Sequence, residues 1–275
     1  DFGSSLLMYE SLGGNNSDRY TYVLPSYNFS KNFFLENFDG SFNVASNGNY
    51  TINNTNISST KIGNNLTFTS FDYFSDIGIV TKYDLEFSNI NSMSDNSSKY
   101  KNSPQSELMS AYFINSSLPF QKITKDRQNT LTPKLNFRIS PHDMKNHSLT
   151  GRGVYISNVF SNNRLGLGDS FETGESITLG IDFKKEKINQ IDKVVEIEGI
   201  GINSDNLTSS QKKKLIRGVD FKTETVEKIE EYFDFKLATV FRFNKEEHIP
   251  LTSTINEKTS NIFGLVGYKP IEMPL

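Results

Sequence analysis

The residues that most often carry chemistry are few in this chain and form no catalytic pattern. The three histidines, His142, His147 and His248, lack the HExxH spacing of zinc proteases, and we expect them to be solvated loop residues. No GxSxG stretch is present, so the sharp turn that exposes a nucleophilic serine is missing. The glycine pairs at 166–168 and 199–201 lack the third glycine of a dinucleotide-binding loop. We therefore predict no enzyme activity, no bound metal ion and no cofactor.

Two clusters of charge leave alternatives open. Asp169, Glu172 and Glu175 could bind calcium, but they lack the spacing of a calcium loop, and solvated side chains are the simpler interpretation. The basic run at 212–214, with Arg217, could contact lipid phosphates or could be a solvated loop. The chain contains no cysteine, which excludes a disulfide scaffold and a thiolate metal site within it.

The composition of the chain indicates that β-strands are its main secondary structure. Of the 275 residues, 35% are hydrophobic, which is below the ~45–50% of an average globular domain. The chain has 22 Phe and 12 Tyr but no Trp, so strand-forming aromatic residues dominate its apolar content. A net charge of −3 argues against a nucleic-acid partner. No apolar run reaches the ~18 residues of a transmembrane helix.

Alternation of apolar and polar residues is the dominant pattern. In "SITLGIDF" (176–183) the odd positions are apolar and the even positions are Ser, Thr, Gly and Asp. A period of two indicates a strand with one apolar and one polar face. Further strands are expected at 3–10, 20–24, 39–46, 62–71, 77–88, 107–117, 134–140, 152–160, 193–202, 233–243 and 259–269. We thus predict roughly a dozen strands, mostly about ten residues long, which exceeds the usual length.

The segments between the expected strands are polar and rich in turn residues. The longest is 203–231, in which we expect a short helix from Thr223 to Glu231. Two architectures fit strands with two unlike faces. In a soluble sandwich or barrel the apolar face is the core, whereas in a membrane barrel it meets lipid and the charged face lines a wet lumen. Long strands with mid-strand charges such as Lys236 and Arg242 favour the membrane barrel.

Three segments in order resemble the barrel of the LptD family, the outer-membrane lipopolysaccharide-assembly proteins. They are "LTPKLNFRISPHDMKN" (131–146), "VYISNVFSNNRLGLGDSFETGESITLGIDF" (154–183) and "FDFKLATVFRFNKEEHIPLTSTINEKTSNIFGLVGYKP" (233–270). The segment "SSLLMYESLGGNNSDRYTYVLPSYNFSK" (4–31) is similar to earlier strands of that barrel. The most specific part of the resemblance consists of Asn163, Arg164, Asp169, Glu172, Gly174 and Gly180.

The resemblance implies a fold and a function. The implied fold is all-β, an antiparallel transmembrane outer-membrane β-barrel of which residues 1–275 form a middle portion. The family's periplasmic N-terminal jelly-roll domain and its terminal barrel strands are then absent from this chain. The implied function is transport of lipopolysaccharide and its insertion into the outer leaflet of the Gram-negative outer membrane. The implied partners are lipopolysaccharide, outer-membrane lipids, an LptE-type lipoprotein plug and, through the jelly-roll domain, an LptA-type periplasmic bridge.

The same hypothesis assigns the two faces of the strands. The residues expected to face the lumen are Lys134, Arg138, Asp182, Asp234, Lys236 and Arg242. The residues expected to face lipid are Ile177, Leu179, Ile181, Phe235, Leu237 and Phe241. Two alternatives remain: a general porin or uptake channel on the same architecture, and a soluble extracellular β-sandwich that acts as an adhesin or binding module.

Overall fold

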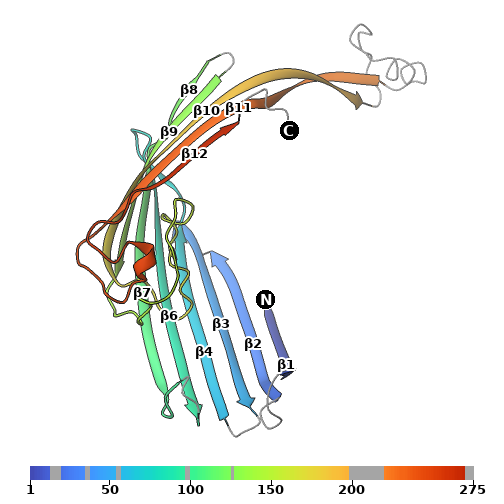
Figure 1. The fold of residues 1–275 in the computed structure, drawn as a ribbon. Helices are drawn as coiled ribbons and strands as arrows, with labels where there is room; N and C mark the ends of the chain where they lie inside the picture. The colour runs from blue at the N-terminus through green and yellow to red at the C-terminus, as the bar shows by residue number, and fades with distance from the viewer. Residues whose placement is uncertain are drawn as a thin grey trace. The chain divides into compact units, whose positions relative to one another are not determined.

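The protein is built from strands (Figure 1). The computed structural model describes residues 1–12, 20–34, 38–53, 57–96, 100–124, 127–197 and 220–269, and over 188–197 and 220–231 it describes the backbone alone. The strands are β1 (Phe2–Glu10), β2 (Tyr20–Phe34), β3 (Gly40–Asn53), β4 (Ile57–Ser70), β5 (Tyr73–Phe74), β6 (Val80–Asp95), β7 (Gln105–Ser117), β8 (Phe120–Ile123), β9 (Arg127–Ser140), β10 (Gly174–Ile197), β11 (Asp220–Arg242) and β12 (Phe263–Lys269). One 3-10 helix, Leu251–Ser253, completes the described elements. None of the described residues forms a helix with the length and apolarity needed to cross a membrane.

The strands form one 12-stranded sheet, which confirms the prediction of an all-β fold with about a dozen strands. Its order is β1-β2-β3-β4-β6-β7-β9-β10-β11-β12, with β5 beside β6 and β8 beside β9. The strand pairs from β1 to β9 are antiparallel. This order has two ends, so over the described residues the sheet is not closed into a barrel.

The register gives the sheet two faces of opposite character. Phe113 of β7 pairs with Asp84 on one side and Arg138 on the other, so these three residues share a face. We call this side, with the even-numbered positions of β6 and β9, the polar face. It carries Asp84, Glu86, Ser88, Asn136, Arg138 and Ser140, together with Met109, Ala111 and Phe113 of β7. The opposite side, the apolar face, carries Tyr83, Leu85, Phe87, Tyr112, Ile114, Leu135, Phe137 and Ile139.

Two long loops supply the compact core, and one of them covers part of the polar face. They are residues 141–173, between β9 and β10, and residues 243–262, between β11 and β12. Their apolar residues pack against Ala238 and Val240 of β11. The buried members of this core are Met144, Val154, Val159, Leu165, Leu167, Ala238, Val240, Ile249 and Ile255. Most of the buried apolar side chains therefore lie where the loops pack on the sheet. This is expected, because the strands have a polar face and cannot form an apolar core by themselves.

The prediction of a strand over 152–160 is wrong, because this segment belongs to the loop 141–173. Asn158 holds the segment in turns. Its Oδ1 accepts a hydrogen bond from the Tyr155 backbone N–H at 2.7 Å, and its Nδ2 donates to the Arg164 carbonyl at 3.1 Å. Asparagine side chains bond to nearby backbone groups in this way and compete with strand pairing. The apolar residues of the segment contribute to the loop core instead, through Val154 and Val159.

The expected helix from Thr223 to Glu231 is also wrong, because the backbone there belongs to β11. The spacing of Val226 and Ile229 fitted one helical turn, but pairing in the sheet decides the conformation of such a short segment. The basic run at 212–214, Arg217 and the glycines at 199–201 lie outside the described residues.

The chain divides into two compact units. Unit 1 contains Asp1–Pro119, Thr132–Ile181 and Leu237–Gly264, and therefore β1 to β7 and both long loops. Unit 2 contains Phe120–Leu131, Asp182–Lys236 and Leu265–Leu275, and its described part includes β8 and the far portions of β10 and β11.

Candidate functional site

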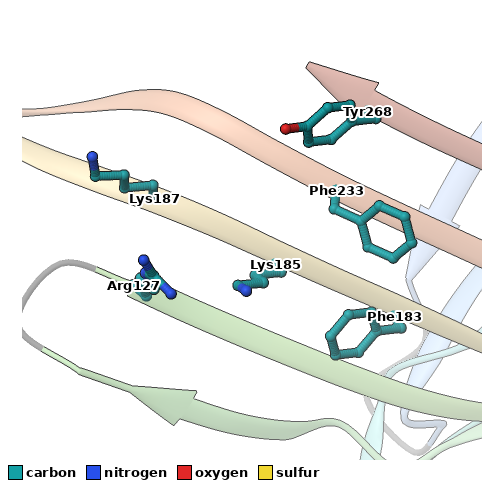
Figure 2. A pocket seen from close by; sticks show the side chains of 6 residues that line it. All are labelled: Arg127, Phe183, Lys185, Lys187, Phe233 and Tyr268. Atoms are coloured by element: carbon teal, nitrogen blue, oxygen red, sulfur yellow. The ribbon is translucent and has the colours of Figure 1, made fainter. Parts of the chain in front are cut away.

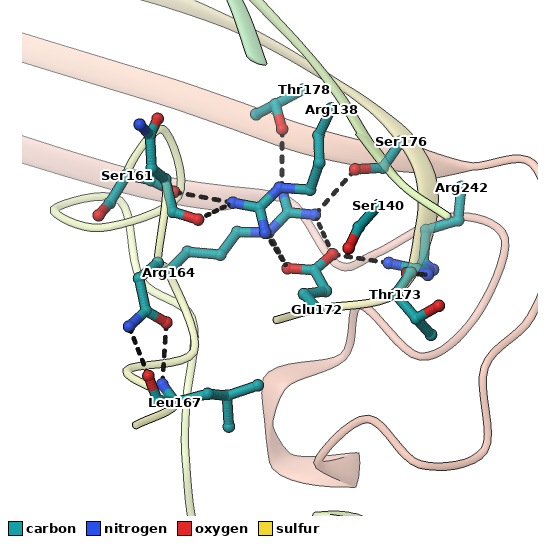
Figure 3. Close-up of polar contacts among 12 residues, drawn as sticks. Arg138, Ser140, Ser161, Arg164, Leu167, Glu172, Thr173, Ser176, Thr178 and Arg242 are labelled. Carbon is teal, nitrogen blue, oxygen red and sulfur yellow. Dashed lines mark hydrogen bonds and ion pairs between the residues drawn. The ribbon is translucent and has the colours of Figure 1, made fainter. Parts of the chain in front are cut away.

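Four charged residues from distant parts of the sequence meet under the loop 141–173 (Figure 3). Arg164 forms a two-pronged pair with Glu172, from Nε to Oε2 at 2.8 Å and from Nη2 to Oε1 at 2.5 Å. Arg138 of β9 donates to Glu172 Oε2 at 3.1 Å, and Arg242 of β11 donates to Oε1 at 2.6 Å. We call these four residues the arginine–glutamate cluster. A single carboxylate thus ties the loop to two strands.

The alternation of β10 provides partners for two further donors of Arg164. Its Nη1 donates to Thr178 Oγ1 at 2.9 Å and its Nη2 to Ser176 Oγ at 3.0 Å. Both hydroxyl residues are fully buried, at 0% exposure. A buried guanidinium must find an acceptor for each N–H group, and hydroxyls at alternate positions of one strand can accept from the same fork. This explains why Ser176 and Thr178, on the even side of β10, are polar although water does not reach them.

Arg138 connects the cluster to the rest of the polar face. Its Nη2 donates to the Ser161 carbonyl at 3.1 Å and also to the carbonyl of Asn162. The guanidinium lies 4.8 Å from the centroid of the Phe113 ring, a cation–π contact. Asn162 in turn donates to Glu86 of β6 at 3.1 Å. The loop is therefore bonded across the polar face from β6 to β11.

Charge in the cluster is unbalanced, with three guanidiniums around one carboxylate. Burial alone raises the pKa of Glu172, but Arg164, Arg138 and Arg242 outweigh it and hold that pKa well below its usual range. The Glu172 carboxylate is therefore ionised at every physiological pH. Because every guanidinium of the cluster already contacts the carboxylate, we interpret the cluster as stabilising the fold.

We expect the stability of the protein to depend on acid through Glu172. A carboxyl whose folded-state pKa is lowered stabilises the fold above its unfolded-state pKa, near the ordinary value of 4.5. That contribution is lost as the pH falls from there toward the folded-state pKa. The urea midpoint of unfolding should therefore be similar at about pH 7 and about pH 5.5, and should decrease below about pH 4.5.

The variant Glu172→Gln isolates this effect. His142, whose burial lowers its pKa, also responds to acid, but it is present in both proteins and its contribution cancels in the difference. The stability gap between wild type and variant should shrink as the pH is lowered. A gap that stays constant down to about pH 3 would contradict the assignment.

The turn that presents Arg164 is closed by its neighbour Asn163. The Asn163 Nδ2 donates to the Leu167 carbonyl at 2.7 Å, and the Leu167 N–H donates to Asn163 Oδ1 at 2.8 Å. Gly166 between them has φ +61°, a left-handed conformation that favours glycine.

Asp169, further along the same loop, lies 3.2 Å from His147 Nε2 and 3.9 Å from Lys145 Nζ.

Gly180 has a steric role. A Cβ atom there would lie 2.6 Å from Cζ of Phe160 and 2.9 Å from the Leu237 carbonyl oxygen. The close approach of the Phe160 ring and of the backbone of β11 therefore requires glycine at this position.

We expect Gly180→Ala to lower the free energy of unfolding by about 1–3 kcal/mol, because the backbone of β11 has to move. The matched control is Gly63→Ala in β4, where the nearest atom, Oδ1 of Asn47, would be 3.4 Å away. Urea unfolding of both variants measures the difference. Equal effects would show that the close approach at Gly180 carries no cost.

The structure brings together part of the motif found in the sequence. Arg164 and Glu172 meet in the cluster, Asn163 shapes the turn before it, and Gly174, at φ +81°, lies against Arg242, whose Nη2 would be 2.9 Å from a Cβ at that glycine. Asp169 lies apart, in the pair with His147, and Gly180 acts on the strand contact.

Two expectations about solvation are wrong. Glu172 is 3% exposed rather than solvated, because it is the sole acid that contacts the three arginines within the described cluster. His142 and His147 are partly buried, and Nδ1 of His142 accepts a hydrogen bond from the Ser110 N–H at 3.3 Å. His248 is exposed, as expected.

In the part of the chain that the structure describes, no group of three or more acidic or histidine side chains is placed to hold a metal ion.

The residues assigned to the two faces occupy different environments. Arg138 and Arg242 are buried in the cluster, and Nζ of Lys134 lies 5.8 Å from the Phe160 ring centroid. Leu179 and Phe241 are exposed, at 43% and 41%. Intermediate exposure is found for Asp182, Asp234, Lys236, Ile177, Ile181, Phe235 and Leu237. The assignment to lumen and lipid remains a prediction.

The sequence did not reveal that Arg138, Arg164 and Arg242 converge on Glu172. The available signal was weak: an arginine at a polar position of each of two alternating segments, and Arg164 and Glu172 eight residues apart in a loop. Which carboxylate the strand arginines contact depends on how the loop folds back.

Comparison with known proteins assigns no family. No model of a protein family matches this chain, and no curated protein matches its sequence.

Proposed function

We propose that this chain forms part of the wall of a bacterial outer-membrane β-barrel that transports lipopolysaccharide, as in the LptD family. The observation that carries the proposal is the reversed polarity of the sheet. Arg138 on the polar face is 2% exposed, whereas Leu135 on the apolar face of the same strand is 38% exposed. A soluble protein buries its large apolar residues, and extended exposed apolar surface marks contact with lipid or another protein.

Strand length supports the membrane interpretation, whereas the open strand order means that the proposed barrel needs further strands. A tilted transmembrane strand needs ~9–11 residues, and β3, β4, β6 and β7 have 14, 14, 16 and 13 residues. In lipid every backbone N–H and C=O group must be paired, which strands achieve only in a closed barrel. Further strands, from outside the described part of the chain, would pair with β1 and β12 and close the barrel.

Transport of lipopolysaccharide is the more specific part of the proposal and rests on the resemblance of 131–146, 154–183 and 233–270 to the LptD family. The chemistry of the polar face is compatible with it. A hollow of about 360 Å³ lies there beside the loop and is lined in part by Asn43, Asn65, Glu86 and Ser88. Sugars and phosphates cross such a surface at much lower cost than they cross hydrocarbon. An LptE-type plug and an LptA-type bridge are the partners that this function would require.

The two alternatives make different demands. A soluble β-sandwich would bury the apolar face, but Leu179, Phe241 and Leu135 are exposed. A porin or uptake channel would have the same two faces, and the two functions differ in what passes along the polar face.

The first test is the membrane residence of the full-length protein in its native envelope. We expect a urea-resistant outer-membrane fraction whose gel mobility depends on heating, because closed barrels resist unfolding until heated. A urea-soluble or secreted protein would overturn the outer-membrane proposal.

The second test concerns the substrate. A photo-crosslinking residue at Asn65, in the polar hollow, should form adducts with lipopolysaccharide in cells. The control position is Thr178, which has the same polar orientation but is fully buried behind Arg164. Adducts at Asn65 alone support transport. A membrane barrel without adducts at Asn65 would favour the porin alternative.

A further inference from the structure

A second hollow, of about 420 Å³, lies within unit 2 (Figure 2). It is lined by Arg127 of β9, Phe183, Lys185 and Lys187 of β10, Phe233 of β11 and Tyr268 of β12. Its size falls in the range of ligand-binding pockets, about 300–1,000 Å³. Figure 2 shows the three cationic side chains on one side of the hollow and the three rings on the other.

The described side chains that line the hollow carry charge of one sign. Its described lining contains three cations and no acid. The nearest acids along β10, Asp182 and Glu186, occupy even positions and so point to the other side of the strand. Glu186 has its own partner there, Lys184, at 2.6 Å. Lys185 and Lys187 therefore place two ammonium groups in the hollow, where an anion could approach.

The apolar wall has a defined geometry. The rings of Phe183 and Phe233 lie 6.2 Å apart between centroids and are tilted by 57°. Together with Tyr268 they offer an apolar surface beside the cations. A ligand that fits must be anionic at one end and apolar at the other.

The position of the hollow along β10 indicates the kind of ligand. Odd-numbered positions of this strand are apolar from Ile177 to Phe183 and then become basic at Lys185 and Lys187. Aromatic residues followed by basic ones are typical of the boundary between hydrocarbon and water. Basic residues at this boundary attract anionic lipid headgroups.

We propose that this hollow binds the phosphate of an anionic phospholipid headgroup, with Lys185 and Lys187 on the phosphate and Phe183, Phe233 and Tyr268 against the glycerol and first acyl carbons. This site rests on the proposed membrane function, because it needs the apolar side of β10 to face lipid. It does not depend on lipopolysaccharide being the transported molecule.

The test uses the full-length protein in nanodiscs of phosphatidylcholine mixed with phosphatidylglycerol. Lipids retained by the protein after extraction into mild detergent are counted by native mass spectrometry. We expect wild type to retain phosphatidylglycerol preferentially, and Lys185→Gln/Lys187→Gln to reduce the preference by about fivefold for each lysine removed. The matched control, Lys184→Gln/Lys245→Gln, removes two lysines outside the hollow and should keep the wild-type preference.

The possible outcomes separate the site from the function on which it rests. Insertion into nanodiscs without preference for phosphatidylglycerol overturns the site and leaves the membrane proposal intact. Equal loss of preference in the test and control variants means that net charge, not this hollow, selects the lipid, and also overturns the site. Failure of the wild type to insert overturns the membrane function itself. If inorganic phosphate displaces the lipid but chloride at equal ionic strength does not, the ligand of the hollow is a soluble anion, and the assignment to a lipid headgroup is overturned.

Discussion

Glu172→Gln should unfold the loop 141–173 from the polar face and lower the free energy of unfolding by about 3–5 kcal/mol, the usual cost of removing one partner from a buried ion pair. The glutamine retains the shape and one acceptor oxygen but loses the charge. Arg138, Arg164 and Arg242 would then remain buried within contact of one another with no carboxylate between them. Repulsion in a poorly solvated site adds to the loss of the hydrogen bonds.

Urea unfolding in detergent measures this effect, and protease cleavage within 141–173 reports the loop separately. The control is Glu175→Gln, the same substitution three residues away at an exposed side chain, which should change stability by less than about 0.5 kcal/mol. Because the residues form one network, Arg164→Met should cost less in the Glu172→Gln background than in wild type. If Glu172→Gln and Glu175→Gln behave alike, the cluster does not hold the loop.

The strands could be predicted well because their signal is local. Alternation in 176–183 is a property of adjacent residues, and both the strand and its two unlike faces follow from it. The strand predicted over 152–160 failed, because its apolar residues are grouped at 154–156 and 159–160 rather than alternating, and Asn158 between the groups bonds to the local backbone. Apolar and aromatic content without regular alternation does not distinguish a strand from a loop that packs its apolar residues inward.

The cluster could not be predicted, because it depends on contacts between residues far apart in the chain. Glu172 and Arg242 are 70 residues apart and meet only through the pairing order of β9, β10 and β11. The sequence placed both strand arginines on the polar side. The sequence does not indicate that the loop 141–173 supplies the carboxylate that pairs with these arginines, or that the loop excludes water from the cluster.

Leu179→Arg should strongly reduce the amount of folded protein in the outer membrane. Leu179 is 43% exposed on the apolar side of β10. In a soluble protein, arginine at an exposed position changes stability by about 0.5 kcal/mol or less. In a membrane barrel, arginine on the lipid-facing side near the midplane costs about 2–4 kcal/mol. The expected cost therefore differs severalfold between the two architectures. The amount of urea-resistant protein with heat-dependent gel mobility measures it.

Two further arginine substitutions show whether lipid is the cause. Leu251 is 58% exposed in the loop 243–262, outside the strands, and Leu251→Arg should be tolerated in either architecture. Phe243 follows the last residue of β11, and its N–H donates to the Glu175 carbonyl at 3.2 Å, four residues along β10 from Leu179. At ~3.3 Å per residue this is ~13 Å along the strand, enough to move from the hydrocarbon toward the interface. Phe243→Arg should thus cost only about 0–1 kcal/mol. A graded loss, large at Leu179 and small at Phe243, is the signature of depth in a bilayer, whereas equal tolerance at all three positions would remove the physical basis of the outer-membrane proposal.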